Sequence, residues 1–216
     1  RLFPLPDLVM YPHVVQPLHI FESRYCEMLN DALDSDGLLT MCMLGEGWEE
    51  EYDSRPPIYP YGCLGKVITH KRLDDGTYNL MLLGQRRVRI VEELPPLRSF
   101  REARVELLDD VYPDSGEETR AELQTDLLAA FQVALPGESV PNASIRELLS
   151  SQAPLGVLTD LVGFALPLAP ELKRDLLREP DVDRRAQMLL GALTDDPPQP
   201  PQRRRDPWQT LPFSQN

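Results

Sequence analysis

Side chains that could perform catalysis are scarce in this chain of 216 residues, and their spacing fits neither ATP hydrolysis nor acyl transfer. A P-loop requires Gly, four residues and then Gly-Lys-Ser/Thr, because its backbone N–H groups wrap the phosphates. The single Gly-Lys pair, Gly65-Lys66, is followed by Val67 and preceded five residues earlier by Pro60. The sequence therefore predicts no P-loop ATPase.

Nucleophilic hydrolysis and metal binding have no better support. A serine–histidine site needs a histidine base, and the chain has only three histidines and no Gly-x-Ser-x-Gly elbow. The histidines and cysteines show no metal-ligand spacing either, and they are His13, His19, His70, Cys26, Cys42 and Cys63. We expect no enzyme, no cofactor and no metal site, with His19 in a structural role and the cysteines as buried thiols.

The most unusual local feature is the segment 45–61, where carboxylates alternate with aromatic rings between two predicted strands. Exposed rings beside carboxylates suit the recognition of basic and apolar peptides through area burial and cation–π contacts. The alternative is a solvated loop whose rings fold back on the domain. The turn at Met10-Tyr11-Pro12 is a second candidate, because it is apolar and we expect it at a surface bend. The candidate peptide-binding residues are Met10, Tyr11, Trp48, Tyr52, Tyr59 and Tyr61.

Composition narrows the class of partner. The net charge is −13, from 22 basic and 35 acidic residues, and such a field repels phosphate backbones. Nucleic acid is therefore a disfavoured partner, although the composition still allows a local basic patch. No apolar run approaches the ~20 residues of a membrane span, so we expect no membrane partner. Cysteines that are odd in number and lack a C-x-x-C pair are typical of a reducing compartment, so we expect a cytoplasmic protein. The oligomeric state is left open.

Residues 1–112 predict a strand-rich domain with one long helix. Apolar residues recur at helical spacing from Phe21 to Leu33, and we expect this helix to end before Gly37. Asp74-Asp75-Gly76 is a hairpin signal, because glycine supplies the φ > 0 that the turn needs. Gly84 is expected to interrupt the strand that follows. The predicted extended segments are 2–6, 14–20, 38–44, 62–72, 77–83, 87–92 and 101–108.

Three arginines, Arg86, Arg87 and Arg89, make one of these strands locally basic. They could bind an acidic segment of a partner, or they could pair with the abundant carboxylates nearby. We favour the second interpretation in so acidic a protein, and the expected carboxylates are Glu92, Glu93 and Glu102.

Residues 113–194 predict a bundle of short helices. Ser115 and Glu118 form a capping-box pattern before the first amphipathic stripe. Further helices are expected near 144–149, 155–166, 170–178 and 182–193, and we take their leucine stripes as core rather than as faces that bind a partner. Residues 195–216 are rich in proline and arginine and predict a disordered tail, because they cannot bury enough apolar area to offset chain entropy.

Several local motifs together resemble the N-terminal substrate-binding domain of Lon proteases over about residues 1–193. In the helical half, the segment 161–168 followed by 171–177 is similar to a Leu-Pro-Leu-like turn before a charged helix in that family. In the first half the motifs are Pro17-Leu-His-Ile-Phe-Glu22 with Arg24-Tyr25, Tyr61-Gly62, Asp75-Gly76 and Gly84-Gln-Arg-Arg87.

The resemblance implies an α+β fold, with a PUA-like curled β-domain over 1–112 followed by an α-helical bundle over 113–194. It also implies capture of unfolded or degron-bearing polypeptides. No segment resembles the ATPase or the serine–lysine peptidase of Lon, so we expect a stand-alone, bacterial-type and non-enzymatic protein. Such a module could be an adaptor that presents polypeptides to a protease or chaperone partner in protein quality control. The alternative is an RNA-binding protein that uses the PUA-like fold.

Overall fold

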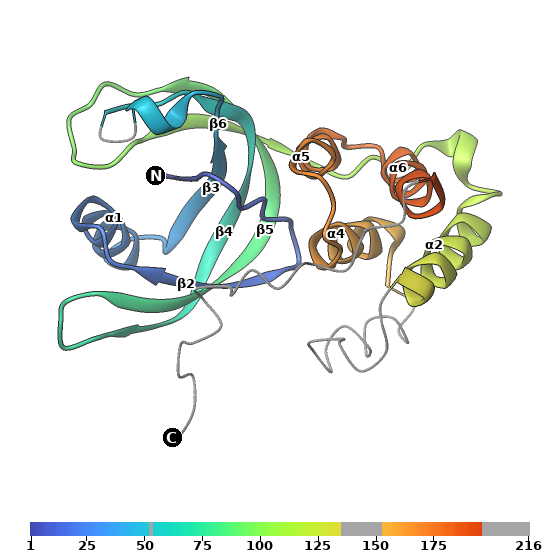
Figure 1. Ribbon diagram of the computed structural model, residues 1–216, viewed down its shortest axis with the longest axis horizontal. Helices are drawn as coiled ribbons and strands as arrows, with labels where there is room; N and C mark the ends of the chain where they lie inside the picture. The colour runs from blue at the N-terminus through green and yellow to red at the C-terminus, as the bar shows by residue number, and fades with distance from the viewer. Residues whose placement is uncertain (52–53, 135–152, 196–216) are drawn as a thin grey trace.

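A curled six-stranded sheet and a group of packed helices make up the computed structural model, which describes residues 1–51, 54–134 and 153–195 (Figure 1). The strands are β1 (Leu2–Leu5), β2 (Val15–Ile20), β3 (Leu38–Leu44), β4 (Ile58–Arg72), β5 (Tyr78–Glu93) and β6 (Ala103–Leu108). The helices are α1 (Ser23–Leu33), α2 (Arg120–Ala134), α4 (Leu155–Ala165), α5 (Pro170–Arg178) and α6 (Val182–Asp195), with 3₁₀ turns η1 (Trp48–Glu51) and η2 (Asp114–Gly116). The fold is therefore α+β.

The sheet is mixed, with the strand order β1-β3-β4-β5-β2 and with β6 also paired to β5. Only the β1–β3 pair is parallel among these strands. β5 is long enough to pair with β2 through its first half and with β6 through its second half. The N–H of Leu2 donates to the carbonyl of Arg101 at 2.8 Å, so the start of β1 meets the chain just before β6 and the sheet curls back on itself.

Helix α1 lies in the open mouth of the curled sheet, and it buries Tyr25, Met28 and neighbouring apolar residues (Figure 1). The expected end of this helix is confirmed, because Gly37 adopts φ +65° and its N–H donates to the Ala32 carbonyl at 2.7 Å. Phe21 was expected in the buried stripe, and this was wrong. Glu22 is extended, so Phe21 precedes the helix, leaves 59% of its surface exposed and stacks beside His19.

Glycine plays opposite roles at two points of the β4–β5 hairpin. At the tip, Gly76 has φ +86° and the N–H of Leu73 donates to the Thr77 carbonyl at 2.9 Å, so the predicted hairpin turn is confirmed. Gly84 was expected to interrupt the strand, but β5 runs through it without a break. The register between β4 and β5 shifts here, which indicates a bulge rather than a strand end.

The helices α2, α4, α5 and α6 lie on the other side of the sheet from α1 (Figure 1). The first of them starts later than the capping-box pattern predicted, since Asp114–Gly116 forms the 3₁₀ turn η2 and α2 begins at Arg120. The Arg120 guanidinium pairs with Asp183 of α6 at 2.7 Å and donates to the Pro113 carbonyl at 2.6 Å, and these contacts hold the first turn of α2 in place. No helix in the described ranges is long and apolar enough to cross a membrane. The helix expected near 144–149 and residues 196–216 lie outside the described residues.

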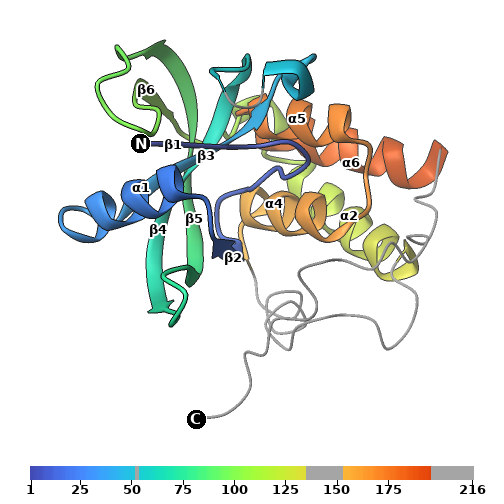
Figure 2. The same ribbon diagram turned by 60° about the vertical axis from the view of Figure 1, so that its left-hand side comes forward.

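One apolar core joins the sheet to the helices. The same cluster of buried side chains contains Tyr11, Leu82 of β5, Leu161 of α4 and Leu189 of α6. Figure 2 shows why: the segment between β1 and β2 leaves the sheet, reaches α4 and α5, and returns. The N-terminal segment therefore lies between the two halves and packs against both.

Candidate functional site

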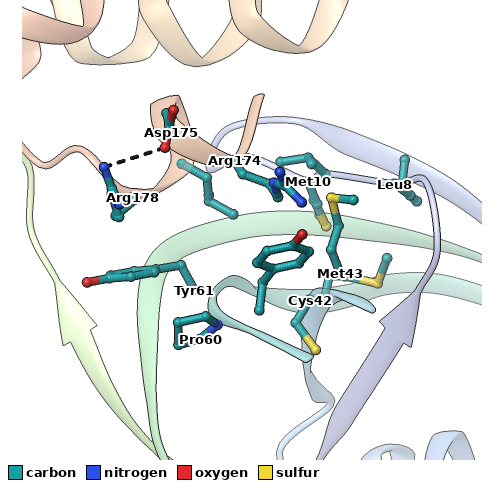
Figure 3. Close-up of a pocket in the computed structure, with 13 residues that line it drawn as sticks. Leu8, Met10, Cys42, Met43, Pro60, Tyr61, Arg174, Asp175 and Arg178 are labelled. Carbon is teal, nitrogen blue, oxygen red and sulfur yellow. Dashed lines mark ion pairs between the residues drawn. The ribbon is translucent and has the colours of Figure 1, made fainter. Parts of the chain in front are cut away.

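A partly open cavity of about 190 Å³ lies where the sheet meets α5 (Figure 3). Its lining comes from four segments that are far apart in the sequence, namely residues 8–10, 41–43, 59–61 and the helix α5. The cavity therefore exists only when the helices are docked on the sheet.

Three methionines, Met10, Met41 and Met43, give the cavity an apolar and adaptable wall. All three are largely buried, at 1%, 1% and 8% exposure. A methionine side chain is unbranched and polarisable, so it can adjust to apolar groups of different shape. In Figure 3, Met10 and Met43 lie on one side of the cavity and Tyr61 lies on the other. Such a wall can accept an apolar side chain without demanding one particular shape.

The rim of the cavity is charged and belongs to α5. Proline begins this helix, where its missing N–H costs nothing, and Leu176 and Leu177 are buried against the core. Arg174 and Arg178 follow one helical turn apart and reach the cavity from above in Figure 3. Arg178 pairs with Asp175 at 3.5 Å, so the rim carries two guanidinium groups and one carboxylate.

Tyr59 already has a cationic partner within the chain. The guanidinium carbon of Arg174 lies 3.9 Å from the centroid of the Tyr59 ring, which is a close cation–π contact. We expected the rings of this segment to lie beside carboxylates and to receive a basic peptide. At the cavity, however, Tyr59 and Tyr61 lie beside arginines, because α5 docks over them.

Three of the predicted binding residues, Met10, Tyr59 and Tyr61, are brought together at this cavity. Trp48 is half-buried in η1 and does not line the cavity. Tyr52 lies outside the described residues. Whether any of these side chains contacts a polypeptide stays a prediction.

The turn at Met10-Tyr11 is not the exposed surface bend that we expected, because both residues are only 1% exposed. The hydroxyl of Tyr11 donates to the carbonyl of Lys173 in α5 at 2.7 Å, and burial raises the pKa of this phenol. A Cβ at position 84 would collide with the Tyr11 carbonyl oxygen, so glycine lets β5 approach this backbone closely. The turn is buried because the helices cover it.

The cavity residues that sequence reasoning missed are mainly Met41, Met43, Arg174 and Arg178. Met41 and Met43 belong to an apolar run that predicts a buried strand, and their spacing of two places them on one face. That spacing is a weak signal that could have been noticed. The two arginines carry no comparable signal, because only the docking of α5 brings them to the cavity.

A buried ion-pair network fastens the helices to the sheet. Arg87 of β5 and Asp160 of α4 form a two-bond pair, in which Nη1 donates to Oδ2 at 3.1 Å and Nη2 to Oδ1. Asp110, in the connection after β6, lies 3.2 Å from Arg87 Nη1 and accepts 2.8 and 2.9 Å bonds from Arg185 of α6. Four separate segments thus meet in one cluster of charges.

Burial and charge act in opposite directions on these carboxyl groups. Burial raises the pKa of Asp160, which is 0% exposed, although Arg87 opposes this shift. Burial also acts to raise the pKa of Asp110, but the bonds from Arg185 and the charge of Arg87 outweigh it and hold that pKa below its usual range. The network is therefore a structural device whose charges depend on one another.

The neighbouring arginines of β5 are also paired, but with carboxylates other than those expected. Arg86 contacts Asp109 and Arg89 contacts Glu106, the latter at 2.5 Å, rather than Glu92, Glu93 or Glu102. β6 and the residues just after it supply these carboxylates because β6 pairs with this half of β5.

Thiol and metal chemistry have no arrangement to support them within the described ranges. Burial raises the pKa of both Cys42 and Cys63 to about 12, so these thiols stay protonated at neutral pH. The part of the chain that the structure describes contains no group of three His, Cys, Asp or Glu side chains placed to hold a metal ion.

Comparison with known proteins gives a consistent result. A family model described as the ATP-dependent protease La (LON) substrate-binding domain matches residues 1–195. Lon protease 2 of Desulfotalea psychrophila is 30% identical over 193 residues, which cover 89% of this chain and 24% of that protein. Lon protease of Escherichia coli K12 is 24% identical over 193 residues, with the same coverage. The chain thus spans about a quarter of the length of these relatives.

Two solved structures share the fold. The N-terminal domain of Mycobacterium avium complex Lon protease superposes with a TM-score of 0.68 at 21% identity, covering 90% of this chain and 97% of that one. A Lon N-terminal domain protein from Xanthomonas campestris gives a TM-score of 0.61 at 23% identity, covering 88% and 95%. The matched region is a substrate-binding domain, not an ATPase or a peptidase.

Proposed function

We propose that this chain, which belongs to the Lon substrate-binding domain family, is a non-enzymatic module that binds unfolded or degron-bearing polypeptides. The observation that carries the proposal is the methionine-walled cavity at the junction of sheet and helices. Its apolar wall and charged rim suit an apolar side chain flanked by polar groups.

Binding would depend on burial of one apolar side chain at a time. Full burial of such a side chain contributes about 1.5–3 kcal/mol, and an unfolded polypeptide loses entropy when it becomes ordered. Because the gain from burying one side chain is small and the polypeptide loses entropy, we expect weak affinity and tolerance of many sequences. Trp48 and Tyr52, which the sequence singles out, are proposed as further contacts.

The wider role is proposed from the family. An adaptor that presents polypeptides to a protease or chaperone would be a cytoplasmic component of protein quality control. We also propose that residues 1–112 and 113–194 are its two structural units and that the sheet is PUA-like. RNA binding through such a sheet is the alternative, but the arginines of β5 are already paired with carboxylates.

The experiment is fluorescence anisotropy of the purified chain against a labelled, unfolded casein-type polypeptide and a short RNA, at two salt concentrations. Tyr59→Ala should weaken polypeptide binding about tenfold, as truncation of a contact residue does. The thermal melt should show a modest loss beside it, because the Tyr59 ring also packs against the core and Arg174. Phe21→Ala is the matched control, because that ring is exposed and lies outside the cavity. Salt-sensitive RNA binding without polypeptide binding would refute the proposal in favour of the alternative.

A further inference from the structure

A second hollow, of about 110 Å³, is lined by arginines. It lies between the first turn of α1, the segment 54–56 and the loop that joins β5 to β6. Among the described residues that line it, four are arginine and none is Asp or Glu, in a chain whose net charge is −13. The arginines are Arg24, Arg55, Arg98 and Arg101.

Three of these guanidinium groups, those of Arg24, Arg98 and Arg101, are fixed by carboxylates that lie outside the lining. Arg24 donates to Glu22 at 2.9 and 2.7 Å. Arg101 donates to Glu93 at 2.8 and 2.5 Å and to the Pro56 carbonyl at 2.8 Å. Arg98 is bonded to Asp31 and also lies over the Phe100 ring. A guanidinium has five N–H donors, so each group keeps donors beyond these bonds. The supporting carboxylates thus orient the three arginines without using all their donors.

Arg55 is held more loosely than the other three. Its bonds to the Leu94 carbonyl are 3.4 and 3.5 Å long, and its ion-pair partner within the described part of the chain, Glu93, is 3.7 Å away. These distances exceed those of a well-formed charged hydrogen bond. Its side chain is 36% exposed at the edge of the hollow. Arg55 is therefore a positive group whose hydrogen bonding would improve if an anion entered.

The rest of the lining is largely apolar and includes Pro4, Leu44, Pro56, Pro96 and the rings of Tyr25 and Phe100. Apolar walls beside arginines in a small space suit a ligand with one anionic group next to an apolar body. An internal Asp or Glu side chain fits poorly, because the peptide would have to continue in both directions. The last residue of a polypeptide has the required form, since its α-carboxylate adjoins its side chain.

We propose that this hollow binds the C-terminal carboxylate of a polypeptide, with the last side chain against the apolar wall. The inference rests on the proposed function, because its ligand is the end of a bound polypeptide. It adds a second subsite in which Arg55 and Arg98 recognise charge. Arginine suits this task because its fork of N–H donors matches the two oxygens of a carboxylate.

The test compares two forms of a labelled pentapeptide, Gly-Ser-Ala-Leu-Leu, one with a free carboxylate and one with a C-terminal amide. Anisotropy with the full chain should show about tenfold weaker binding of the amide. Arg55→Gln should weaken the free acid about tenfold and leave the amide unchanged. Arg104→Gln is the control, because Arg104 is 69% exposed, pairs with Glu92 and lies outside the hollow.

Four results would overturn the inference. The first two are equal binding of the two peptide forms and equal weakening by Arg55→Gln and Arg104→Gln. The third is an amidated peptide with an internal Glu that binds as tightly as the free acid. The fourth is displacement of the labelled free acid by inorganic phosphate at the same concentration as by the unlabelled acid. Failure of the proposed function is distinguishable, because then neither peptide form nor the unfolded polypeptide would bind.

Discussion

Loss of one charge from the buried pair Arg87–Asp160 should destabilise the chain strongly. The two side chains are 2% and 1% exposed, and they connect β5 to α4. Asp160→Ala would leave the Arg87 guanidinium buried, with Asp110 at 3.2 Å as its remaining carboxylate. Removal of one partner of a buried pair costs about 3–5 kcal/mol. Because Asp110 still pairs with Arg87, we expect the free energy of unfolding to fall by about 3 kcal/mol, the lower end of this range.

The assay is urea unfolding followed by far-UV circular dichroism, with linear extrapolation to water. Glu106→Ala is the matched control, since Glu106 pairs with Arg89 two residues along the same strand and both side chains are about half exposed. An exposed pair of this kind contributes about 0–1 kcal/mol. The double variant Arg87→Met with Asp160→Leu should recover most of the lost stability, because neither buried charge is then left alone.

Two results would refute this reasoning. A loss below about 1 kcal/mol for Asp160→Ala would mean that the buried guanidinium finds water or another partner at little cost. A double variant as unstable as the sum of its single variants would mean that packing, not an uncompensated charge, is responsible.

Two further perturbations test the packing and the charges around this junction. Gly84→Ala should lower the free energy of unfolding by about 1–3 kcal/mol, because its Cβ would collide with the Tyr11 carbonyl oxygen. Gly191→Ala is the control, because a Cβ added there has no atom within 4 Å, and it should leave the melting temperature unchanged or raise it. The low folded-state pKa of Asp110 gives stability that is present above the unfolded value of about 4 and is lost as the pH falls below it. The urea midpoint should therefore decrease when the pH is lowered from 6 to 3, and Asp110→Asn should make this decrease smaller. A decrease of the same size in Asp110→Asn would contradict the role given to Asp110.

Local chemistry was enough to predict the elements whose form depends on neighbouring residues. The Asp75-Gly76 turn follows from the φ that glycine allows, and the end of α1 before Gly37 follows from the same property. Gly84 was mispredicted because its role depends on a distant contact, since the register shift between β4 and β5 lets it continue the strand. Phe21 was mispredicted for a local reason, because the extended Glu22 beside it leaves Phe21 outside the helix.

The candidate site was predictable only in part, for a related reason. The aromatic pattern of segment 45–61 identified Tyr59 and Tyr61, which do line the cavity. No pattern identified Arg174, because its place beside Tyr59 is set by the docking of a helix more than a hundred residues later. Burial of Tyr11 also results from helix docking, since its ring is covered by helices that come much later in the sequence and cannot be predicted from its neighbours.

The cavity and the ion-pair network depend on the same docking. The cavity takes three walls from the sheet and the N-terminal segment and one from α5, so it would be an open surface without the helices. Two of the contacts that hold the helices in place, the Arg87–Asp160 pair and the Tyr11 bond to Lys173, do not line the cavity, whereas the contact of Arg174 with Tyr59 does. A polypeptide could therefore occupy the cavity without disturbing the first two contacts. The adaptable methionines and the exposed rim could adjust to different sequences while the buried charges keep the two halves together.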